Sequence, residues 1–172
     1  NGEILSTDYT IIATEANNLI RNLRNQQLDW KSCQTLYFKA ADRIIEKPFI
    51  GLIANKECLI NNIFYHTSLK TRKKGSGELL SVTVVNQHKL TNDQLVEKIT
   101  KELDEECSIN GVEFLKIYTI PNALPNLHNL QYEVSASETK LTDYIFLAGD
   151  IQLNGSLNAA MISGERAALG VL

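Results

Sequence analysis

The sequence predicts an α/β or α+β fold with a mixed, mostly antiparallel sheet and about three main helices. Its 172 residues suit one domain of ordinary size with a single hydrophobic core. Apolar residues make up 44% of the chain and charged residues 22%, which is typical of a globular protein and excludes a disordered or collagen-like one. Short β-branched runs alternate with a few segments of helical periodicity, so both kinds of element are expected.

A strand and then a helix are expected first. Residues 8–14 form a short, β-branched apolar run, which indicates a buried strand. From Glu15 to Arg24 the apolar positions recur at spacings of three and four residues, which predicts an amphipathic helix.

The middle of the chain is rich in strand-forming residues. Turn formers such as Pro48, Asn55 and Gly75-Ser76-Gly77 separate four apolar runs, which cover residues 35–40, 49–54, 60–65 and 79–85. An antiparallel meander is the simplest arrangement of these runs. Gly75 and Gly77 follow a basic cluster of Lys70, Arg72, Lys73 and Lys74. Leu80 stands where a dinucleotide fingerprint needs its third glycine, so we interpret the segment as a solvated hairpin tip.

A helix and another strand follow. Thr91 and Gln94 have the spacing of a capping box, and apolar residues then recur every four positions from Leu95 to Cys107, which predicts a helix lying across the sheet. The run 113–120 predicts a strand. Pro121 and Pro125 then favour an extended segment.

The last part of the chain combines a strand, a turn and a helix. Residues 144–148 predict a buried strand that ends at Gly149-Asp150, and a cap at Asn154-Gly155-Ser156 begins a helix that runs to about Gly170. One face of this helix carries only small residues, and a mid-helix glycine suggests close packing there. The stripe consists of Ala159, Ala160, Ser163, Gly164, Ala167 and Ala168.

Composition limits the partners and the location. Seventeen basic and 20 acidic residues give a net charge of −3, so a nucleic-acid partner is not expected. No apolar run approaches the roughly 20 residues that cross a bilayer, so we expect no transmembrane segment. The three widely spaced cysteines indicate buried free thiols in a reducing, cytoplasmic compartment.

Motifs for catalysis are missing, and no residue is assigned a catalytic role. The three histidines lie 22 and 40 residues apart, without the spacing of a metal site, so no metal is expected. No Gly-x-Ser-x-Gly elbow marks a catalytic triad. Four aromatic residues either fill the core or line a substrate cavity, namely Trp30, Tyr37, Phe38 and Tyr65.

The turn and helix start near residue 150 leave two interpretations open. A carboxylate at the end of a strand can accept hydrogen bonds from ribose or ribityl hydroxyls, and the free N–H groups at a helix start suit a pyrophosphate or an electron-rich carbonyl. Alternatively, Asp150 is a turn residue and Ser156 a helix cap.

The same residues resemble a known family. The segments FLAGD (146–150), NGSLNAA (154–160) and SGERAA (163–168) are similar to the C-terminal FAD motif of the flavin-containing amine oxidase and phytoene desaturase-like superfamily. YTIIAT (9–14) resembles the strand at which such enzymes re-enter the FAD domain. IPNALP (120–125) resembles the segment that precedes their final strand.

The resemblance implies the C-terminal part of an FAD-dependent oxidoreductase. Residues 1–172 would form one structural unit, in which 28–126 correspond to the substrate domain and 1–27 and 127–172 are remnants of the FAD domain. The family's Gly-x-Gly-x-x-Gly is missing here, so this chain alone should neither retain FAD nor be active. By matching position, the resemblance implies these cofactor-binding residues: Ala13, Thr14, Gly149, Asp150, Asn154, Gly155, Ser156, Leu157 and Asn158.

The implied reaction is hydride transfer from an amine or an apolar polyene to flavin. The positive end of the last helix would stabilise negative charge on the reduced ring. The isolated chain is expected to expose the small-residue face of that helix or to bury it in a homodimer. The alternative is a non-enzymatic module that binds a ligand or a partner protein.

Overall fold

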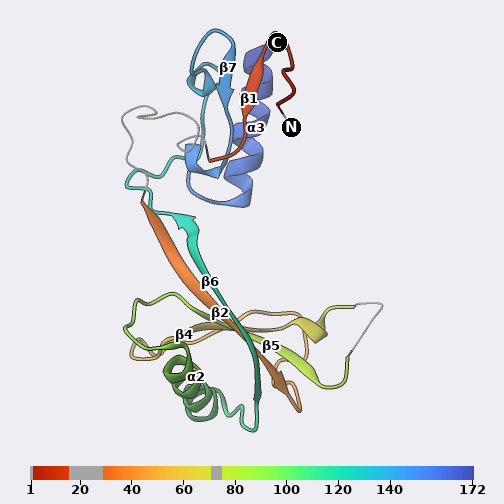
Figure 1. The fold of residues 1–172 in the computed structure, drawn as a ribbon, viewed down its shortest axis with the longest axis vertical. Helices are drawn as coiled ribbons and strands as arrows, with labels where there is room; N and C mark the ends of the chain where they lie inside the picture. The colour runs from red at the N-terminus through yellow and green to blue at the C-terminus, as the bar shows by residue number, and fades with distance from the viewer. Residues whose placement is uncertain (1, 16–28, 71–74) are drawn as a thin grey trace. The chain divides into compact units, whose positions relative to one another are not determined.

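The fold is that of a computed structural model, which describes residues 2–15, 29–70 and 75–172. The chain divides into two compact units (Figure 1): unit 1 comprises Asn1–Trp30 and Leu124–Leu172, and unit 2 comprises Lys31–Ala123. Separate hydrophobic clusters in the two units replace the single core expected from the chain length. Unit 2 covers most of the region 28–126, and that this region is a substrate domain stays a prediction.

Unit 2 is built on a five-stranded sheet of order β3-β4-β5-β2-β6. Its strands are β2 (Trp30–Ala40), β3 (Gly51–Leu52), β4 (Ile60–Tyr65), β5 (Glu78–Val84) and β6 (Glu113–Pro125). The pairings of β3 with β4, β4 with β5 and β5 with β2 are all antiparallel. Two prolines are tolerated in β6 because it is an edge strand, where a missing N–H costs no ladder bond.

The expected meander is only partly correct. Strands β3, β4 and β5 follow one another, but β2 pairs with β5 over seven residue pairs and so lies between β5 and β6. Strand β2 can pair with β5 because it is 11 residues long and its buried side chains lie on the same face of the sheet as those of β5. The run 49–54 contributes only the two residues of β3.

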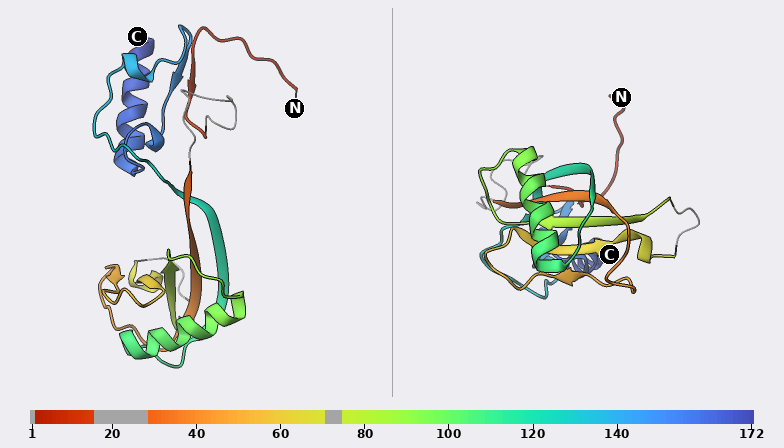
Figure 2. Two further views of the ribbon diagram at one scale, coloured as in Figure 1. Left: turned by 90° about the vertical axis from the view of Figure 1, so that its left-hand side faces the viewer. Right: turned by 90° about the horizontal axis from the view of Figure 1, so that it is seen from below.

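The predicted helix at residue 92 is confirmed as α2 (Asn92–Cys107), which lies across the sheet of unit 2 (Figure 2). Both halves of the capping box form, because Thr91 Oγ1 accepts from the Gln94 N–H and the Gln94 side chain accepts from the Thr91 N–H. Its apolar stripe joins one face of the sheet in the main core, which contains Leu36, Phe38, Ala40, Ile60, Ile63, Tyr65, Leu80, Val82, Val84, Leu95, Ile99, Leu103 and Ile109.

Unit 1 contains a two-stranded parallel sheet of β1 (Thr10–Ile12) and β7 (Ile145–Leu147), with α3 (Leu157–Val171) packed beside it. Phe146, Ala148 and Ala167 form the contact between β7 and α3. The strand predicted over 8–14 has only three residues, and Ile11 is 41% exposed rather than buried. Ile11 is exposed because the sheet of unit 1 has only two strands among the described residues, and no further layer of those residues covers β1.

The helices differ in number from the prediction. The described residues hold two α-helices, α2 and α3, where about three were expected. The helix predicted over residues 15–24 lies almost wholly outside the described residues, as does most of the basic cluster before Gly75. No helix in the described ranges is long and apolar enough to cross a membrane.

Candidate functional site

Parallel pairing brings the two predicted cofactor segments to one edge of the unit 1 sheet. Thr10, Ile11 and Ile12 pair in register with Ile145, Phe146 and Leu147. The Ala148 N–H also donates to the Ile12 carbonyl at 2.9 Å, which extends the ladder past the end of both strands. The residues that follow the strands, 13–14 and 149–150, therefore leave the sheet at the same carboxyl edge. Open sheets of parallel strands bind ligands outside this edge.

Gly149 turns the chain at this edge. Its φ of 136° is a conformation that favours glycine, and a Cβ built on it would have no heavy atom within 4 Å. The backbone is therefore open to close approach by a ligand. The side chain of Ser163 on α3, which is fully buried, holds the turn from behind: the Gly149 N–H donates to Ser163 Oγ at 2.9 Å, and that hydroxyl lies 2.9 Å from the Gly149 carbonyl.

Asp150 begins a short 3₁₀ turn, η4 (Asp150–Gln152). Its backbone carbonyl accepts from the N–H groups of Leu153 at 3.1 Å and Gly155 at 3.0 Å. Its side chain is half-buried, and no hydrogen bond or ion pair within the described residues uses its carboxylate. That carboxylate remains able to accept hydrogen bonds from ligand hydroxyls.

The start of α3 is capped and exposed. Ser156 Oγ accepts from the Ala159 N–H at 3.1 Å and donates to Asn154 Oδ1 at 2.6 Å. The first intrahelical bond runs from the Ala160 N–H to the Ser156 carbonyl. Within the described structure the N–H groups of residues 157 and 158 therefore have no helical partner, and Leu157 is 78% exposed. The positive end of the helix dipole therefore lies at an exposed position.

The nine predicted cofactor residues thus fall into two groups within unit 1. Ala13, Thr14, Gly149 and Asp150 lie at the sheet edge, and residues 154–158 form the start of α3. Asn154 has a supporting role, because its side-chain amide donates to the Gln131 carbonyl at 3.0 Å. Gly155, at a φ of 71°, packs against Pro125, which lies 3.1 Å from the position of a Cβ. That these residues hold a cofactor stays a prediction.

The small-residue stripe of α3 divides into two rows. Ala159, Ser163 and Ala167 are buried within unit 1, whereas the row of residues 160, 164 and 168 is half-buried or exposed. A Cβ on Gly164 would meet no atom within 4 Å, so the packing reason expected for this glycine is wrong for the described residues. Ser163 was predicted only to be one of the small residues of the stripe. Its hydroxyl among Ala and Gly was the available signal for the hydrogen bonds that it forms.

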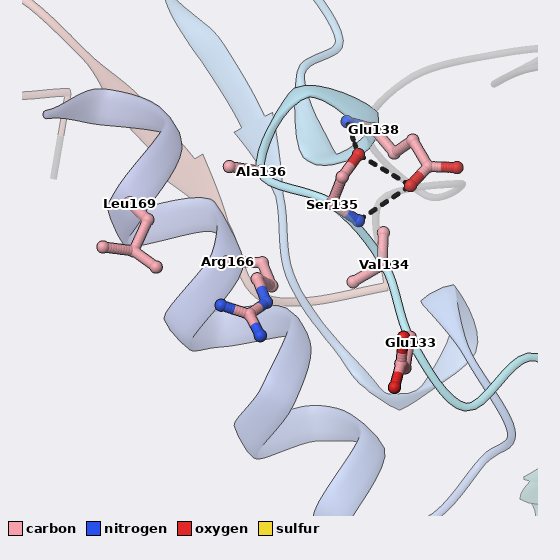
Figure 3. Close-up of a pocket in the computed structure, with 7 residues that line it drawn as sticks. All are labelled: Glu133, Val134, Ser135, Ala136, Glu138, Arg166 and Leu169. Carbon is pink, nitrogen blue, oxygen red and sulfur yellow. Dashed lines mark hydrogen bonds between the residues drawn. The ribbon is translucent and has the colours of Figure 1, made fainter.

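A hollow in unit 1 lies between α3 and the segment 133–138, away from the predicted cofactor residues (Figure 3). Arg166 and Leu169 of α3 line one side, and Glu138 is held there by the N–H and hydroxyl of Ser135, each at 2.7 Å. This hollow contains none of the nine predicted residues. The described residues also include no group of three or more His, Cys, Asp or Glu placed to bind a metal.

The aromatic residues that were predicted to fill the core or line a cavity lie on both faces of the unit 2 sheet. Phe38 and Tyr65 are buried in the core beneath α2, whereas Tyr37 alternates with Phe38 and faces the other side of the sheet. The three cysteines are free thiols as expected, with Cys58 buried and Cys33 and Cys107 half-buried. Burial, followed by the negative charges of Glu102 and Glu106, raises the pKa of Cys58 above its ordinary value.

Comparison with known proteins identifies the fold. No protein-family model matches the chain, and a search of curated proteins found no significant match. Among solved structures, 95% of the chain matches 41% of a putative protoporphyrinogen oxidase from Exiguobacterium sp. 255-15, at 16% identity and a TM-score of 0.62. Likewise, 90% of this chain matches 37% of an oxidoreductase from Methanosarcina mazei, at 11% identity and a TM-score of 0.56.

A third match is a Pyrococcus furiosus protein, with 97% of this chain aligned to 39% of that one at 14% identity and a TM-score of 0.54. Identities this low establish the fold alone. The chain spans about two-fifths of the length of the solved structures that it matches. The chain therefore shares its fold with part of each of these three solved structures.

Proposed function

We propose that this chain is the C-terminal part of an FAD-dependent oxidoreductase. It would supply the closing strand, turn and helix of the FAD domain together with the sheet of the substrate domain. The observation that carries the proposal is the parallel pairing of β1 with β7, which brings residues 13–14 and 149–150 to one carboxyl edge although they lie far apart in the sequence. Two of the matched structures are oxidoreductases by name, which supports the same class for this chain.

The residues at this edge fit part of FAD. Gly149 leaves room for close approach, and the Asp150 carboxylate can accept from ribityl hydroxyls. The N–H groups of residues 157 and 158 can donate to an electron-rich carbonyl oxygen, where the helix dipole would stabilise negative charge. When bound, FAD would supply the two-electron oxidant.

The same residues do not fit the whole cofactor. The chain has no Gly-x-Gly-x-x-Gly to hold the adenosine diphosphate half, and it spans only about two-fifths of the matched structures. We therefore expect the isolated chain to retain no FAD through purification and to be inactive.

The sheet of unit 2 would form a wall of the substrate site. The substrate classes that the resemblance implies are an amine and an apolar polyene, either of which would lose a hydride to flavin. No residue is assigned as an acid or base, because hydride transfer can depend mainly on positioning the donor carbon.

The test is the visible absorption spectrum of the full product of the gene that encodes this chain. We expect bound flavin in the wild type and weaker retention in Asp150→Ala, without loss of folding. Asp104→Ala, on the exposed side of α2, is the matched control and should retain flavin normally. A folded but colourless product would contradict the proposal and favour the non-enzymatic binding module.

We also propose that the isolated chain associates through α3. Leu157, Met161 and Leu169 are exposed apolar residues of this helix, and burying them would stabilise a homodimer. Light scattering should then give a mass above that of one chain, and Met161→Lys should lower it. A clean monomer at all concentrations would contradict this proposal.

A further inference from the structure

One face of the unit 2 sheet is left open by the elements of that unit. The face beneath α2 carries the main core, and strand alternation places the intervening side chains on the opposite face. Register aligns Tyr37 of β2, Ser81 of β5 and Phe64 of β4 in one row across three strands. In the described part of unit 2, α2 is the only α-helix, and it lies on the other side (Figure 2).

Aromatic rings form a connected cluster on this open face. The Tyr37 ring lies 5.8 Å from the Tyr118 ring at an interplanar angle of 89°, and 5.7 Å from the His66 ring. The His66 ring in turn lies 5.0 Å from Phe64, again nearly perpendicular. The Tyr37–Tyr118 and Phe64–His66 pairs are therefore edge-to-face, a favourable arrangement, whereas the Tyr37–His66 pair is tilted at 36°. We call these four residues the aromatic face.

The aromatic face is held in place by a polar contact. His66 Nε2 lies 3.0 Å from the hydroxyl of Ser81, which is buried between the strands. The Ser81 hydroxyl also lies 3.3 Å from the Phe64 carbonyl. Tyr118 is 53% exposed and the other three rings are half-buried, so the aromatic face lies outside the core and can be reached from solvent.

The charges beside the aromatic face are positive. Lys116 Nζ lies 5.7 Å from the centre of the Tyr118 ring. Lys39 follows Tyr37 by two residues on β2 and so lies on the same face. Its contact with Glu113, 4.0 Å between exposed side chains, neutralises little of its charge.

The nearest carboxylate on the central strands does not change this balance. Glu78 of β5 pairs with Ala40, whose side chain belongs to the buried face. The Glu78 carboxylate is also occupied, because it forms an ion pair with Arg43 at 3.2 Å and accepts a hydrogen bond from Thr67.

We propose that the aromatic face binds a flat, apolar ligand that carries an anionic group such as a carboxylate. The rings would stack on the apolar part, while Lys39 and Lys116 would attract the anion and repel a protonated amine. The identification of this ligand as the substrate rests on the proposed function. In that case an amine is excluded as the substrate class, and an apolar substrate bearing a carboxylate is favoured.

Three probes that share a pyrene ring test the charge preference: pyrenebutyric acid, pyrenebutanol and pyrenebutylamine. We expect the 172-residue chain to bind the acid most tightly and the amine most weakly, with about a tenfold ratio at low salt that shrinks as salt is added. Fluorescence titration measures all three affinities. An amine that binds as tightly as the acid would overturn the proposal.

Two variants locate the binding. Lys116→Gln should reduce the ratio of acid to amine affinity to about threefold and leave pyrenebutanol unchanged, whereas Lys101→Gln, on the exposed side of α2, should change nothing. Tyr118→Ala should weaken all three probes by about fivefold. Circular dichroism checks folding, and both side chains are exposed enough to be replaced without loss of core. Unchanged binding in both variants would overturn the assignment to this face.

The two proposals fail in different ways. A colourless full-length product combined with a preserved preference for the acid would remove the flavin function but leave the ligand face. A flavin-containing product without a charge preference would retain the oxidoreductase and remove the anionic substrate class.

Discussion

Glu102 holds α2 against the start of β4 in the unit 2 sheet through a buried carboxylate, and its replacement should be costly. The residue is 3% exposed. Its Oε2 accepts from the N–H groups of Leu59 at 3.0 Å and Ile60 at 3.1 Å, and Lys98 Nζ lies 3.2 Å from its Oε1. These contacts join the helix to the start of β4, beside the register shift in that strand.

The expected effects follow from the number of donors left without a partner. In Glu102→Ala, two backbone N–H groups lose their acceptor, and a buried unsatisfied donor costs about 1 to 3 kcal/mol, so the free energy of unfolding should fall by about 2 to 6 kcal/mol. Glu102→Gln keeps one oxygen acceptor and should cost about 1 to 2 kcal/mol. Lys98→Ala, with a side chain that is 48% exposed, should cost less than about 1 kcal/mol.

Urea unfolding followed by circular dichroism measures this order, and native-state hydrogen exchange reports directly on the two amides. The amide protons of Leu59 and Ile60 should exchange much faster in Glu102→Ala than in Lys98→Ala. Equal effects of the two alanine substitutions would refute the argument, because they would show that the carboxylate acts only through its ion pair.

Three further predictions concern the turn, the helix start and the buried thiol. Ser163→Ala should destabilise the chain by about 1 to 2 kcal/mol, because the Gly149 N–H loses its acceptor, and should weaken flavin retention in the full gene product; normal retention would contradict the positioning role. Gly155→Val should lower the urea midpoint, since a Cβ would lie 3.1 Å from Pro125 in a backbone region that β-branched residues avoid; an unchanged midpoint would show that the turn can rearrange. The raised pKa of Cys58 means that the unfolded chain releases this proton first. The neutral Cys58 thiol should therefore contribute fully to stability at about pH 8, and this contribution should decline as the pH rises past the ordinary thiol pKa of 9.0. In Cys58→Ala, the free energy of unfolding, measured from unfolding curves, should fall less over this pH range.

Local patterns predicted the elements whose causes are local. The capping box and the four-residue spacing from Leu95 specify α2 almost without reference to the rest of the chain. The position of β2 between β5 and β6 could not be predicted, because strand order depends on pairing between distant segments rather than on any one run. Glu102 lies seven residues after Leu95 and therefore on the same buried face of α2. Its burial was predictable from this spacing, but only apolar residues had been assigned to that face.

The candidate site was predictable in part. Gly149 and the cap at Ser156 stand out because a positive φ and a helix start need those residue types. The clamp by Ser163 required the structure, since a buried hydroxyl and a merely small side chain look alike in sequence. Likewise, only strand direction and register separate Tyr37 on the open face from Phe38 in the core.

The most direct test of the central claim is amide NMR of the 172-residue chain titrated with FAD. If the carboxyl edge of β1 and β7 is part of a flavin site, weak binding should shift the amides of Thr14, Gly149, Leu157 and Asn158 together along one titration curve. Asp150→Ala should reduce these shifts while leaving the spectrum of unit 2 unchanged. Shifts confined to other regions, or none at saturating FAD, would contradict the claim.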